Sequence, residues 1–449
     1  MIAGEHYDVV IAGGGMVGLS LASALATASA SQCRARKKSL QKASPLRILV
    51  VDRMPMKGVE SPSYHPSFDA RATALSLASI DIYREMGVLD NIIAHSTPIR
   101  TIHVSDRGHS GSSVMRAEEE SVDAFGYVVE NQWLGSVLLA SANAATAVEL
   151  CGAASVQAAR PVASGYSVTI ATSVAEQPID SAERGSGVAK GATATATVTT
   201  SLLVVADGAE SALRSALGID AETTPYAQSA VVANVQTQLP HRGCAFERFT
   251  ADGAVALLPL VDSTDESRRS SLVWTLPRAE AEQLIADSDD RALRERLQCA
   301  FGQRLGRITR IGRCHAYPLS LTVSSESVRS HLVIMGNAAH ALHPIAGQGF
   351  NLALRDVAVL VECLMHALDK GQTIGQLEDL ESYSSRQVDD QRITIGFSHR
   401  LIQLFGEQAL PIQAGRSLGL LALDLLPPAK SAFVRRAAGT AGRQARWSW

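Results

Sequence analysis

The sequence predicts an α/β protein in two lobes, one of them built on an open parallel sheet with helices on its faces. A short apolar segment, Tyr7–Ala12, leads directly into the glycine-rich turn Gly13–Gly18 and then into a helix of small residues. Two further apolar segments, Leu202–Ala206 and Leu332–Met335, also end in glycine-containing turns. The chain has 449 residues, of which 46% are hydrophobic, so it can form two or three domains with buried cores.

The first turn has the composition of a phosphate-binding loop. Gly13 to Gly18 reads G-x-G-x-x-G, and the next apolar segment, Ile48–Val51, ends in Asp52. In such a strand–turn–helix unit, Gly13 permits the tight turn, Gly15 lets the backbone approach a pyrophosphate, and Gly18 lets helix and strand pack closely. The helix N-terminus offers free N–H groups to phosphates, and Asp52 can accept hydrogen bonds from ribose hydroxyls. The whole pattern therefore predicts a bound dinucleotide.

The spacing within this unit departs from the usual pattern. Asp52 lies 34 residues after Gly18, whereas the acid usually follows the glycines by about 20 residues. The basic, polar stretch 31–44 accounts for the excess, and we expect it to form a surface loop. A second stretch, 175–200, is rich in Ala, Gly, Ser and Thr and predicts a hairpin-like excursion between strands. The acid favours FAD or NAD, while Arg53 beside it leaves NADP open.

The second turn follows Leu202–Ala206 and consists of Asp207 and Gly208, before a helix that begins near Ser211 and Arg214. A strand that ends in Asp-Gly places a carboxylate at the carboxyl edge of a sheet, where ligands of open α/β sheets bind. The same dipeptide is also a common turn. Its meaning therefore depends on the other two segments.

The third segment combines a strand, a loop and a long helix. The strand ends in Gly336 and Asn337, and a helix with one apolar face begins near Asn351. The loop between them contains Pro344, Gly347 and Gly349. Such a loop at a helix N-terminus is a second site for an anionic or carbonyl-bearing group. Three turns so far apart in the chain cannot all be phosphate loops of one Rossmann unit. A ligand extended along the sheet edge would contact them all, and FAD is such a ligand.

Composition excludes several other classes of protein. The chain carries 41 Lys and Arg against 44 Asp and Glu, a net charge of −3, so it lacks a basic field for nucleic acid. Aromatic residues make up 5%, too few for stacking platforms on single strands. The six cysteines form no CxxC or Cys/His cluster, so we expect no metal site and favour reduced thiols in a cytoplasmic protein. No apolar run reaches the roughly 20 residues of a membrane-spanning helix.

Several segments together resemble one enzyme family. GGGMVG, ADGAESALR and GNAAHALHPIAGQGFNLALRD resemble the three FAD motifs of the flavoprotein aromatic hydroxylases, the para-hydroxybenzoate hydroxylase fold. FDARATALS (68–76) and CAFERFT (244–250) resemble the ubiquinone-biosynthesis branch, the 2-polyprenyl-6-methoxyphenol hydroxylase group. The similarity runs from Asp8 to about Phe405. It implies a Rossmann-type FAD-binding domain (1–75, 125–222 and 318–395), a β-sheet substrate domain (76–124 and 223–317) and a C-terminal helical region with a basic tail (396–449).

The same resemblance implies which residues bind the cofactor. Arg71 matches the arginine of the R-A-x-A-L segment, which approaches the FAD phosphates and the flavin. The third motif usually reads Gly-Asp, whereas this chain has Asn337, whose amide can still accept from and donate to a hydroxyl. The loop before the long helix matches the one that lies against the isoalloxazine ring. The expected cofactor-binding residues are Gly13, Gly15, Gly18, Asp52, Arg71, Asp207, Gly208, Asn337, Pro344, Gly347, Gly349 and Asn351.

No catalytic side chain is assigned with certainty, because a flavin carries the difficult chemistry itself. His343 and Pro344 are candidates in the flavin loop, and His343 could hydrogen bond near the ring. A loop or capping role is the simpler interpretation for His343 and for His340. We interpret the pair Glu247-Arg248 as a surface pair on a strand, and we expect substrate groups among the strands within 223–320.

The resemblance implies a monooxygenase for which NAD(P)H reduces FAD, O₂ is consumed, and one oxygen atom enters the ring of a polyprenylated phenol. Three alternatives stay open: another ring position, an isoprenoid reductase, and a flavin-binding assembly subunit with little turnover. The basic residues and two tryptophans of 429–449 suit a membrane surface, although a helix packed on the domain explains them as well. We expect a cytoplasmic protein, peripheral at the inner face of the membrane, with other ubiquinone-biosynthesis proteins as candidate partners.

Overall fold

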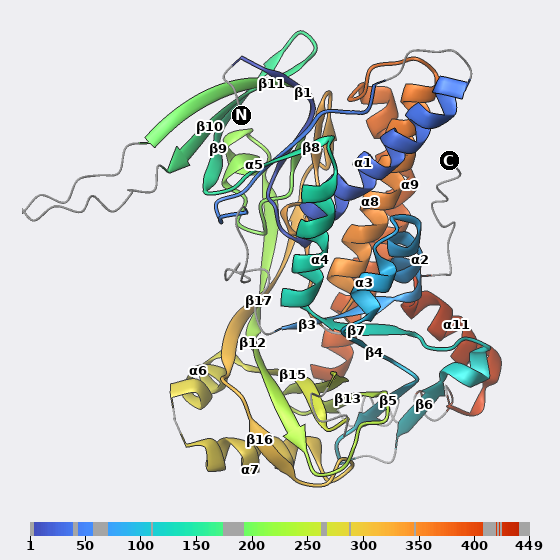
Figure 1. Ribbon diagram of the computed structural model, residues 1–449. Helices are drawn as coiled ribbons and strands as arrows, with labels where there is room; N and C mark the ends of the chain where they lie inside the picture. The colour runs from blue at the N-terminus through green and yellow to red at the C-terminus, as the bar shows by residue number, and fades with distance from the viewer. Residues whose placement is uncertain are drawn as a thin grey trace, which may run out of the picture.

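The computed structural model describes residues 4–38, 44–56, 71–108, 111–173, 193–261, 267–286, 289–344, 347–406, 419, 422 and 424–439. The upper lobe is built on a sheet whose parallel strands lie in the order β19-β11-β1-β2-β8 (Figure 1). Antiparallel β18 pairs with β19, and the β9–β10 hairpin pairs with β11. The bounds are β1 (His6–Ala12), β2 (Ile48–Val51), β8 (Val148–Cys151), β9 (Ala154–Val162), β10 (Gly165–Ser173), β11 (Thr193–Val205), β18 (Val328–Arg329) and β19 (Leu332–Ile334).

The lower lobe is built on a second sheet with the strand order β20-β17-β12-β15-β14-β13-β5-β6, and β16 pairs with β12. Its neighbours are antiparallel except for β13 and β5. Strands β12 and β17 run from the upper lobe into the lower one (Figure 1). The bounds are β5 (Thr101–Asp106), β6 (Ser112–Arg116), β12 (Ala221–Thr237), β13 (Cys244–Thr250), β14 (Gly253–Pro259), β15 (Arg269–Pro277), β16 (Ile308–Ile311), β17 (His315–Ser324) and β20 (His340–Ala341).

A small third sheet, in the order β3-β7-β4, lies between the lobes. Its strands are β3 (Ala72–Ser76), β4 (Ser96–Pro98) and β7 (Gly126–Glu130). The expected segment 76–124 is divided between the lobes. Its helices α2 (Leu77–Glu85) and α3 (Leu89–Ile93) contribute to the core of the upper lobe, while β5 and β6 join the second sheet. The shorter helices elsewhere are η2 (Ala117–Glu120), α5 (Ala212–Ala216), α6 (Arg278–Ala286), α7 (Asp290–Phe301) and η3 (Gly336–Ala338).

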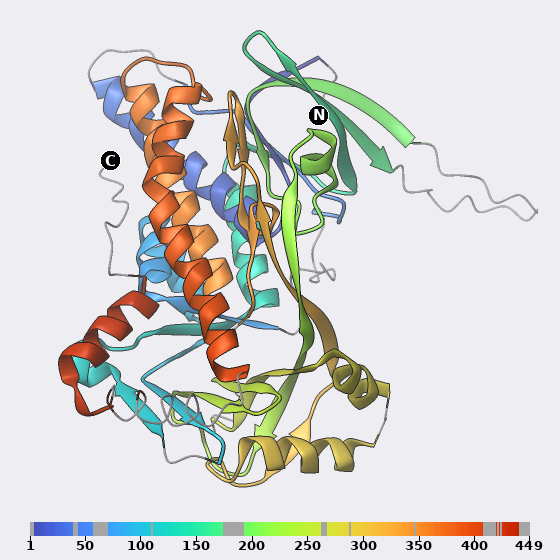
Figure 2. The same ribbon diagram turned by 180° about the vertical axis from the view of Figure 1, so that it is seen from behind.

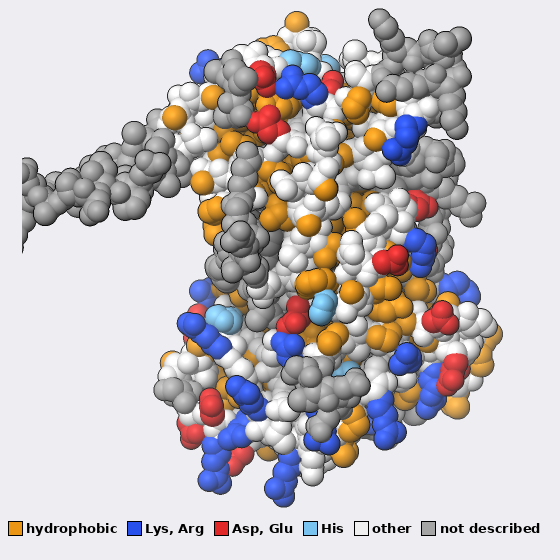
Figure 3. Space-filling view, in the orientation of Figure 1, with side chains coloured by type: hydrophobic (Ala, Val, Ile, Leu, Met, Phe, Trp, Pro, Cys, Tyr) orange, Lys and Arg blue, Asp and Glu red, His pale blue; other side chains and the backbone are white. Residues whose placement is uncertain are grey.

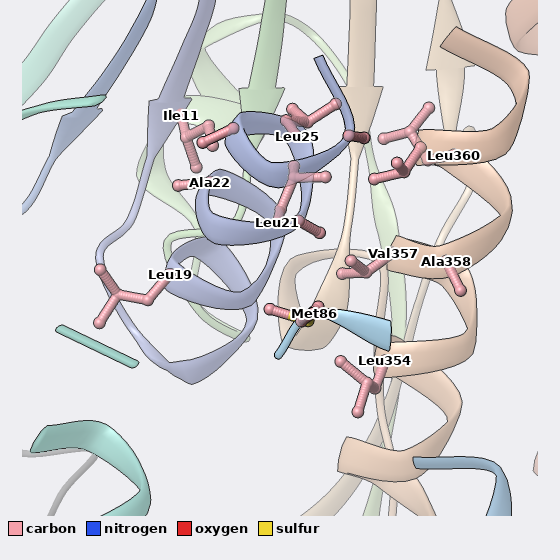
Figure 4. Close-up of a cluster of buried hydrophobic side chains, with 14 of the residues drawn as sticks. Ile11, Leu19, Leu21, Ala22, Leu25, Met86, Leu354, Val357, Ala358 and Leu360 are labelled. Carbon is pink, nitrogen blue, oxygen red and sulfur yellow. The ribbon is translucent and has the colours of Figure 1, made fainter. Parts of the chain in front are cut away.

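The largest core lies between the first sheet and the helices α1 (Met16–Lys38), α4 (Asn131–Ala144) and α8 (Gln348–Asp369). Figure 4 shows Leu21 and Leu25 of α1 on the side of that helix that faces Val357 and Leu360 of α8, with Ile11 of β1 on the other side of α1. These side chains are fully buried. Small residues such as Ala22 let α1 lie close to the sheet, as its composition predicts.

The C-terminal part is helical. Helix α9 (Leu377–Gly406) runs beside α8 and reaches down to the second sheet, and α11 (Pro427–Ala437) lies against the lower lobe (Figure 2). Lys430 of α11 pairs with Glu119 of η2 at 3.0 Å. The predicted α/β fold in two lobes with C-terminal helices is confirmed. Within the described residues, no helix is both long and apolar enough to cross a bilayer.

The expected surface loop at 31–44 is wrong for its first part. Residues 31–38 continue helix α1, in which Gln32 hydrogen bonds the Met365 carbonyl of α8. Arg34 of this segment is exposed, and an exposed helix position tolerates a basic residue, so the lack of an apolar period in the sequence did not exclude a helix. Residues 39–43 lie outside the described part of the chain. The 175–200 stretch joins two antiparallel strands, β10 and β11, but of it only 193–200, within β11, belongs to the described residues.

The turn between β1 and α1 depends on close backbone contact. A Cβ atom on Gly18 would lie 1.9 Å from the Gly13 carbonyl oxygen and 3.3 Å from Ile11 Cγ2. No side chain fits there unless α1 moves off the sheet. The first turn of α1 can therefore lie this close to the end of β1 only because Gly18 has no Cβ atom.

We predict that Gly18→Ala lowers the free energy of unfolding by about 1–3 kcal/mol, because the contact it creates is with backbone that must shift. Urea denaturation of the apo-protein measures this. Gly396→Ala is the matched control: Gly396 also lies in a helix, α9, and nothing is within 4 Å of its Cβ position. The control should be neutral or stabilising by up to about 1 kcal/mol. Equal stability of the two variants would contradict the prediction.

Candidate active site

Four neighbouring strands of the first sheet end in the residues singled out by sequence. Across the sheet, β2 leads to Asp52, β1 to Gly13, β11 to Asp207, and β19 to Gly336 and Asn337. Backbone hydrogen bonds keep these ends level: Ala206 N donates to Ala12 O at 2.7 Å, and Gly13 N donates to Val51 O at 2.8 Å. Three turns far apart in the chain thus form one row at the carboxyl edge of the sheet, where open α/β sheets bind ligands.

The glycine turn leaves no room for side chains. Gly13 has φ +112°, and a Cβ there would lie 2.3 Å from the Ala206 carbonyl oxygen. Gly15 and the first helical residues, Met16 and Val17, line a cavity. The first turn of α1 contains no acidic residue, so the positive end of a 23-residue helix faces that cavity without a competing carboxylate.

Asp52 holds the glycine turn in place through its hydrogen bonds, a role that the sequence did not reveal. Its Oδ2 accepts a hydrogen bond from Gly14 N at 2.6 Å, and its Oδ1 accepts one from Met54 N at 2.8 Å. The carboxylate thereby holds the glycine turn against the end of β2. It also lines the cavity, where a carboxylate can accept hydrogen bonds from a ligand.

The second and third turns are tied together by a buried arginine. Ser211 caps α5 by accepting from Arg214 N at 3.0 Å, and Arg214 Nη1 donates to the Ala338 carbonyl at 2.6 Å. Arg214 thus fixes the position of η3, which presents exposed Asn337 to the cavity. Gly208, with φ +103°, has open space where a Cβ would be. Asp207, Gly208 and Asn337 all line the same cavity.

Asn351 is the hydrogen-bonding centre of the loop region. Its Oδ1 accepts from Ser76 N at 2.9 Å and from Ser79 Oγ at 2.7 Å, and its Nδ2 donates to the carbonyls of Ala74 and Gly347, both at 2.8 Å. All four bonds available to the amide are therefore made within the protein. Asn351 positions the loop at the start of α8, and its side chain has no hydrogen-bonding capacity left for a ligand.

The other loop residues lie around Asn351. Gly347 has φ +59° and begins α8, and its N–H donates to Pro344 O at 3.0 Å. A Cβ on Gly349 would make only an ordinary contact, 3.7 Å from Leu342 Cβ. Pro344, Gly347 and Gly349 all line the cavity. Arg71 lines it as well and stacks on Tyr317 of β17, with 4.8 Å from its guanidinium carbon to the ring centroid.

The two loop histidines have different surroundings. His340 is buried, and its Nε2 lies 2.7 Å from Asp356 Oδ2 on α8, so it ties β20 to that helix. His343 is also buried and packs edge-on against the ring of Tyr226 at 5.4 Å. Burial lowers the pKa of His343 to about 4, so its imidazole is neutral at physiological pH. His343 lines the cavity as a neutral ring.

One cavity of about 1340 Å³ contains this whole site. It begins at the glycine turn, passes the loop before α8, and extends over one face of the second sheet. That face supplies mostly apolar side chains, among them Ile102, Val104, Leu258 and Val273. The C-terminal helices close it with Phe397, Phe433 and Val434, which sequence reasoning did not single out because they come from segments far apart in the chain.

The surface pair expected at 247 and 248 is wrong. Neighbouring residues of a strand point to opposite faces, and here Glu247 lines the cavity while Arg248 Nη1 donates to the Phe301 carbonyl at 2.9 Å on the other face. Burial raises the pKa of Glu247 to about 7. A carboxyl group within an apolar cavity is a functional candidate that the sequence interpretation missed.

The residues present fit an extended dinucleotide. At the row of strand ends, Gly13 exposes backbone without a side chain, and the N-terminus of α1 can bind phosphate. The carboxylates of Asp52 and Asp207 can accept hydrogen bonds from the hydroxyl groups of the dinucleotide. The cavity continues from that row to the loop before α8, where a planar ring would lie beside His343 and Pro344. The part of the same cavity that lies over the second sheet leaves room for another molecule.

Residues 6–389 match the protein family described as FAD binding domain. The chain is 32% identical over 438 residues, 98% of this chain and 91% of the relative, to ubiquinone hydroxylase UbiL of Rhodospirillum rubrum. It is 28% identical to 3-demethoxyubiquinol 3-hydroxylase of Escherichia coli, covering 97% and 99% of the two chains. It is 27% identical to the mitochondrial ubiquinone biosynthesis monooxygenase COQ6 of Mus musculus, covering 95% and 90%.

Solved structures share the fold. The p-nitrophenol 4-monooxygenase PnpA of Pseudomonas putida superposes with a TM-score of 0.71 at 17% identity, covering 98% of this chain and 100% of that one. PqsL of P. aeruginosa in complex with 2-aminobenzoylacetate has a TM-score of 0.69 at 22% identity, covering 93% and 100%. At these identities the likeness concerns the fold alone.

We predict that Asn351→Ala lowers the free energy of unfolding by about 2–4 kcal/mol, since it removes four buried hydrogen bonds and leaves their partners unpaired. Chemical denaturation of the apo-protein measures this independently of any cofactor. Ser79→Ala removes one of the four bonds and should cost about 1 kcal/mol. If both variants lose the same small amount, Asn351 is not the centre of the network.

Proposed function

The chain belongs to the FAD-dependent monooxygenases that share the FAD binding domain, and from this premise we propose that it hydroxylates the aromatic ring of a polyprenylated phenol in ubiquinone biosynthesis. The carrying observation is similarity along 98% of the chain to a relative named ubiquinone hydroxylase. The proposed reaction is ArH + NAD(P)H + H⁺ + O₂ → ArOH + NAD(P)⁺ + H₂O, in which the phenol ring gains one oxygen atom.

Residues along the cavity would hold FAD. Gly13, Gly15 and the N-terminus of α1 suit the pyrophosphate, Asp52 a ribose, and Asp207, Gly208 and Asn337 the linking hydroxyls. When bound, FAD supplies electron transfer from NAD(P)H and activation of O₂. The sequence contains one nucleotide fingerprint, so we propose that NAD(P)H binds transiently rather than in a domain of its own.

The protein's own contribution is to orient the phenol and to exclude water. The sheet face around Val104 and Leu258 offers an apolar floor, and Phe397 and Phe433 close the opposite side. Apolar walls of this kind accept a ring with a hydrocarbon chain and keep bulk solvent from the reacting carbon. His343, neutral through burial, and Pro344 border the loop at which the flavin ring would lie.

Three alternatives predict different results. A hydroxylase of another ring position would need the same groups and would differ only in product. An isoprenoid reductase would reduce a C=C bond without O₂, and an assembly subunit would bind FAD and neighbouring enzymes with little turnover. The apolar part of the cavity beside the row of strand ends favours an enzyme that binds a substrate there, because an assembly subunit would not need a substrate cavity.

We expect the purified protein to bind FAD and to oxidise NAD(P)H rapidly only when a short-chain prenylated methoxyphenol and O₂ are present. Mass spectrometry should show a product heavier by one oxygen atom. The control is Gly15→Val, whose branched side chain would occupy the approach of the pyrophosphate and abolish flavin retention. In the source organism, deletion of the gene should accumulate the phenolic precursor, whose structure names the ring position. Wild-type protein that cannot be loaded with FAD would overturn the proposal.

We further propose that the protein associates peripherally with the cytoplasmic face of a membrane, where a polyprenylated substrate is dissolved. Leu425 and Leu426, just before α11, are 75% and 55% exposed, which is unusual for adjacent leucines. Arg435 and Arg436 are exposed on α11, whereas Lys430 is engaged with Glu119. Figure 3 shows Lys and Arg side chains concentrated on the lower lobe. Trp447 and Trp449 lie outside the described residues. Association with other proteins of the pathway would also occur at this membrane.

We expect Leu425→Ser/Leu426→Ser to reduce binding to anionic liposomes about tenfold in a flotation assay, because two leucine side chains no longer enter the interface. Leu377→Ser is the matched control, since Leu377 is 42% exposed on α9, away from the basic segment. Binding that is unchanged in the double variant would contradict a membrane role for this segment.

A further inference from the structure

Glu247 faces the substrate side of the cavity because of its place in strand β13. Ala245, Glu247 and Phe249 alternate along the strand and all line the cavity, while Phe246 and Arg248 between them face α7. The register places Glu247 opposite Val104 of β5 and Ala256 of β14. Its position is therefore fixed on both sides by paired strands and does not depend on a loop.

The floor around Glu247 is apolar. The neighbouring strands contribute Ile102 and Val104 from β5, Ala256 and Leu258 from β14, and Val273 from β15. Among the described sheet residues that line the cavity, Glu247 is the one carboxylic acid. Within the described part of the chain no hydrogen bond or ion pair holds its carboxyl group, in contrast to Asp52, whose oxygens brace a turn. A half-buried carboxyl group without a protein partner has its hydrogen-bonding capacity available for a ligand.

We propose that the Glu247 carboxylate hydrogen bonds the phenolic hydroxyl of the substrate and accepts its proton. The inference rests on the proposed function and names the residue that activates the substrate of that reaction. A phenol ring carbon attacks an electrophilic oxygen far more readily when the hydroxyl is ionised, since the negative charge is delocalised into the ring. In an apolar cavity, that ionisation needs a base at hydrogen-bonding distance.

The proton balance closes without another reactant. The phenol O–H bond breaks and a carboxylic acid O–H bond forms on Glu247, which leaves a phenolate beside a neutral acid. After oxygen transfer, the substituted ring carbon loses its C–H proton as the ring becomes aromatic again, and this proton goes to the second oxygen atom of O₂, which leaves as water. Glu247 returns its own proton to the original phenol oxygen, and the carboxylate is restored for the next turnover.

The other ionisable groups of the cavity fit this role less well. His343 is held neutral by burial against Tyr226, and its low pKa makes it a weak base. Tyr317 carries the guanidinium of Arg71 on its ring, and Asp207 and Asp52 lie at the strand ends of the other lobe. Burial alone raises the pKa of Glu247 to about 7, which matches a base that works near neutral pH.

The test compares Glu247→Gln and Glu247→Asp with wild-type protein as full-length, FAD-loaded enzyme. Glu222→Gln, which changes an exposed glutamate on β12, is the matched control. The probes are a short-chain prenylated phenol and its fluorinated, more acidic analogue. For the wild type, kcat/KM for hydroxylation should fall as pH is lowered through about 7, since the carboxylate takes up a proton. We expect Glu247→Gln to lose about 100-fold or more at pH 8 and to lose this pH dependence, while Glu247→Asp keeps part of the activity.

The more acidic phenol separates a base from a structural residue. Because it ionises without help, the deficit of Glu247→Gln should shrink at least about tenfold with the fluorinated probe. An equal deficit on both probes, or a wild-type pH profile in the variant, overturns the inference while the proposed function stands. A wild-type enzyme that oxidises NAD(P)H without hydroxylating either phenol overturns the proposed function, and this inference with it.

A stability measurement checks the setting of Glu247 without turnover. The raised pKa in the folded state means that stability is fully present below 4.5, the ordinary value, and is lost as pH rises through about 7. Glu247→Gln removes that loss, so its Tm should exceed the wild-type Tm at pH 8 and match it at pH 4. A lower Tm at both pH values would overturn the inference, because it would show that the carboxyl group has a structural partner.

Discussion

The structure depends on a backbone contact that excludes side chains at the end of β1. Gly13 lies against the Ala206 carbonyl just after β11, and Gly18 of α1 lies against the Gly13 carbonyl, so no side chain separates these three segments. This contact sets the N-terminus of α1 at the sheet edge and levels the neighbouring strand ends. Asp52, Asp207 and Asn337 then project from one row, and the cavity begins there. A methyl group at Gly18 would push α1 away from the end of β1, and one at Gly13 would push away the backbone that follows β11.

Buried polar side chains join the loops to this frame. Asn351 uses its whole amide on β3, on α2 and on the start of α8, and Arg214 connects α5 to η3. His340 joins β20 to Asp356 of α8, whose other oxygen accepts from Gln387 of α9 at 2.7 Å. Unmet buried polar groups are costly, so each of these networks specifies one arrangement of the loop beside the cavity. The site is therefore preorganised by residues that need not touch a ligand.

The sequence predicted the features that depend on residues close together in the chain, such as the strands and the glycine turns that follow them. The three glycine-containing segments predicted the fold, their resemblance to known motifs predicted the family, and both are confirmed. The loop expected at 31–44 is wrong for residues 31–38, because they lie on a helix whose contact with α8 is not visible in the sequence. Glu247 was assigned to the surface because strand polarity was read without knowledge of which face the second sheet buries. Phe397 and Phe433 were missed since their meeting, at 6.0 Å between ring centroids, depends on tertiary structure.

Strand β12 has a mechanical consequence. It pairs with β17 from Ala221 in the upper lobe to Val232 in the lower one, and the ribbon is interrupted by a register shift between Pro225 and Ser229. This two-stranded ribbon sets the distance between the row of strand ends in the first sheet and the second sheet, which carries Glu247. If ligand entry bent this ribbon, the bend would occur at the bulge between Pro225 and Ser229, because hydrogen bonds between the strands are missing there. One continuous strand thus links the lobe that carries the row of strand ends to the sheet of the other lobe.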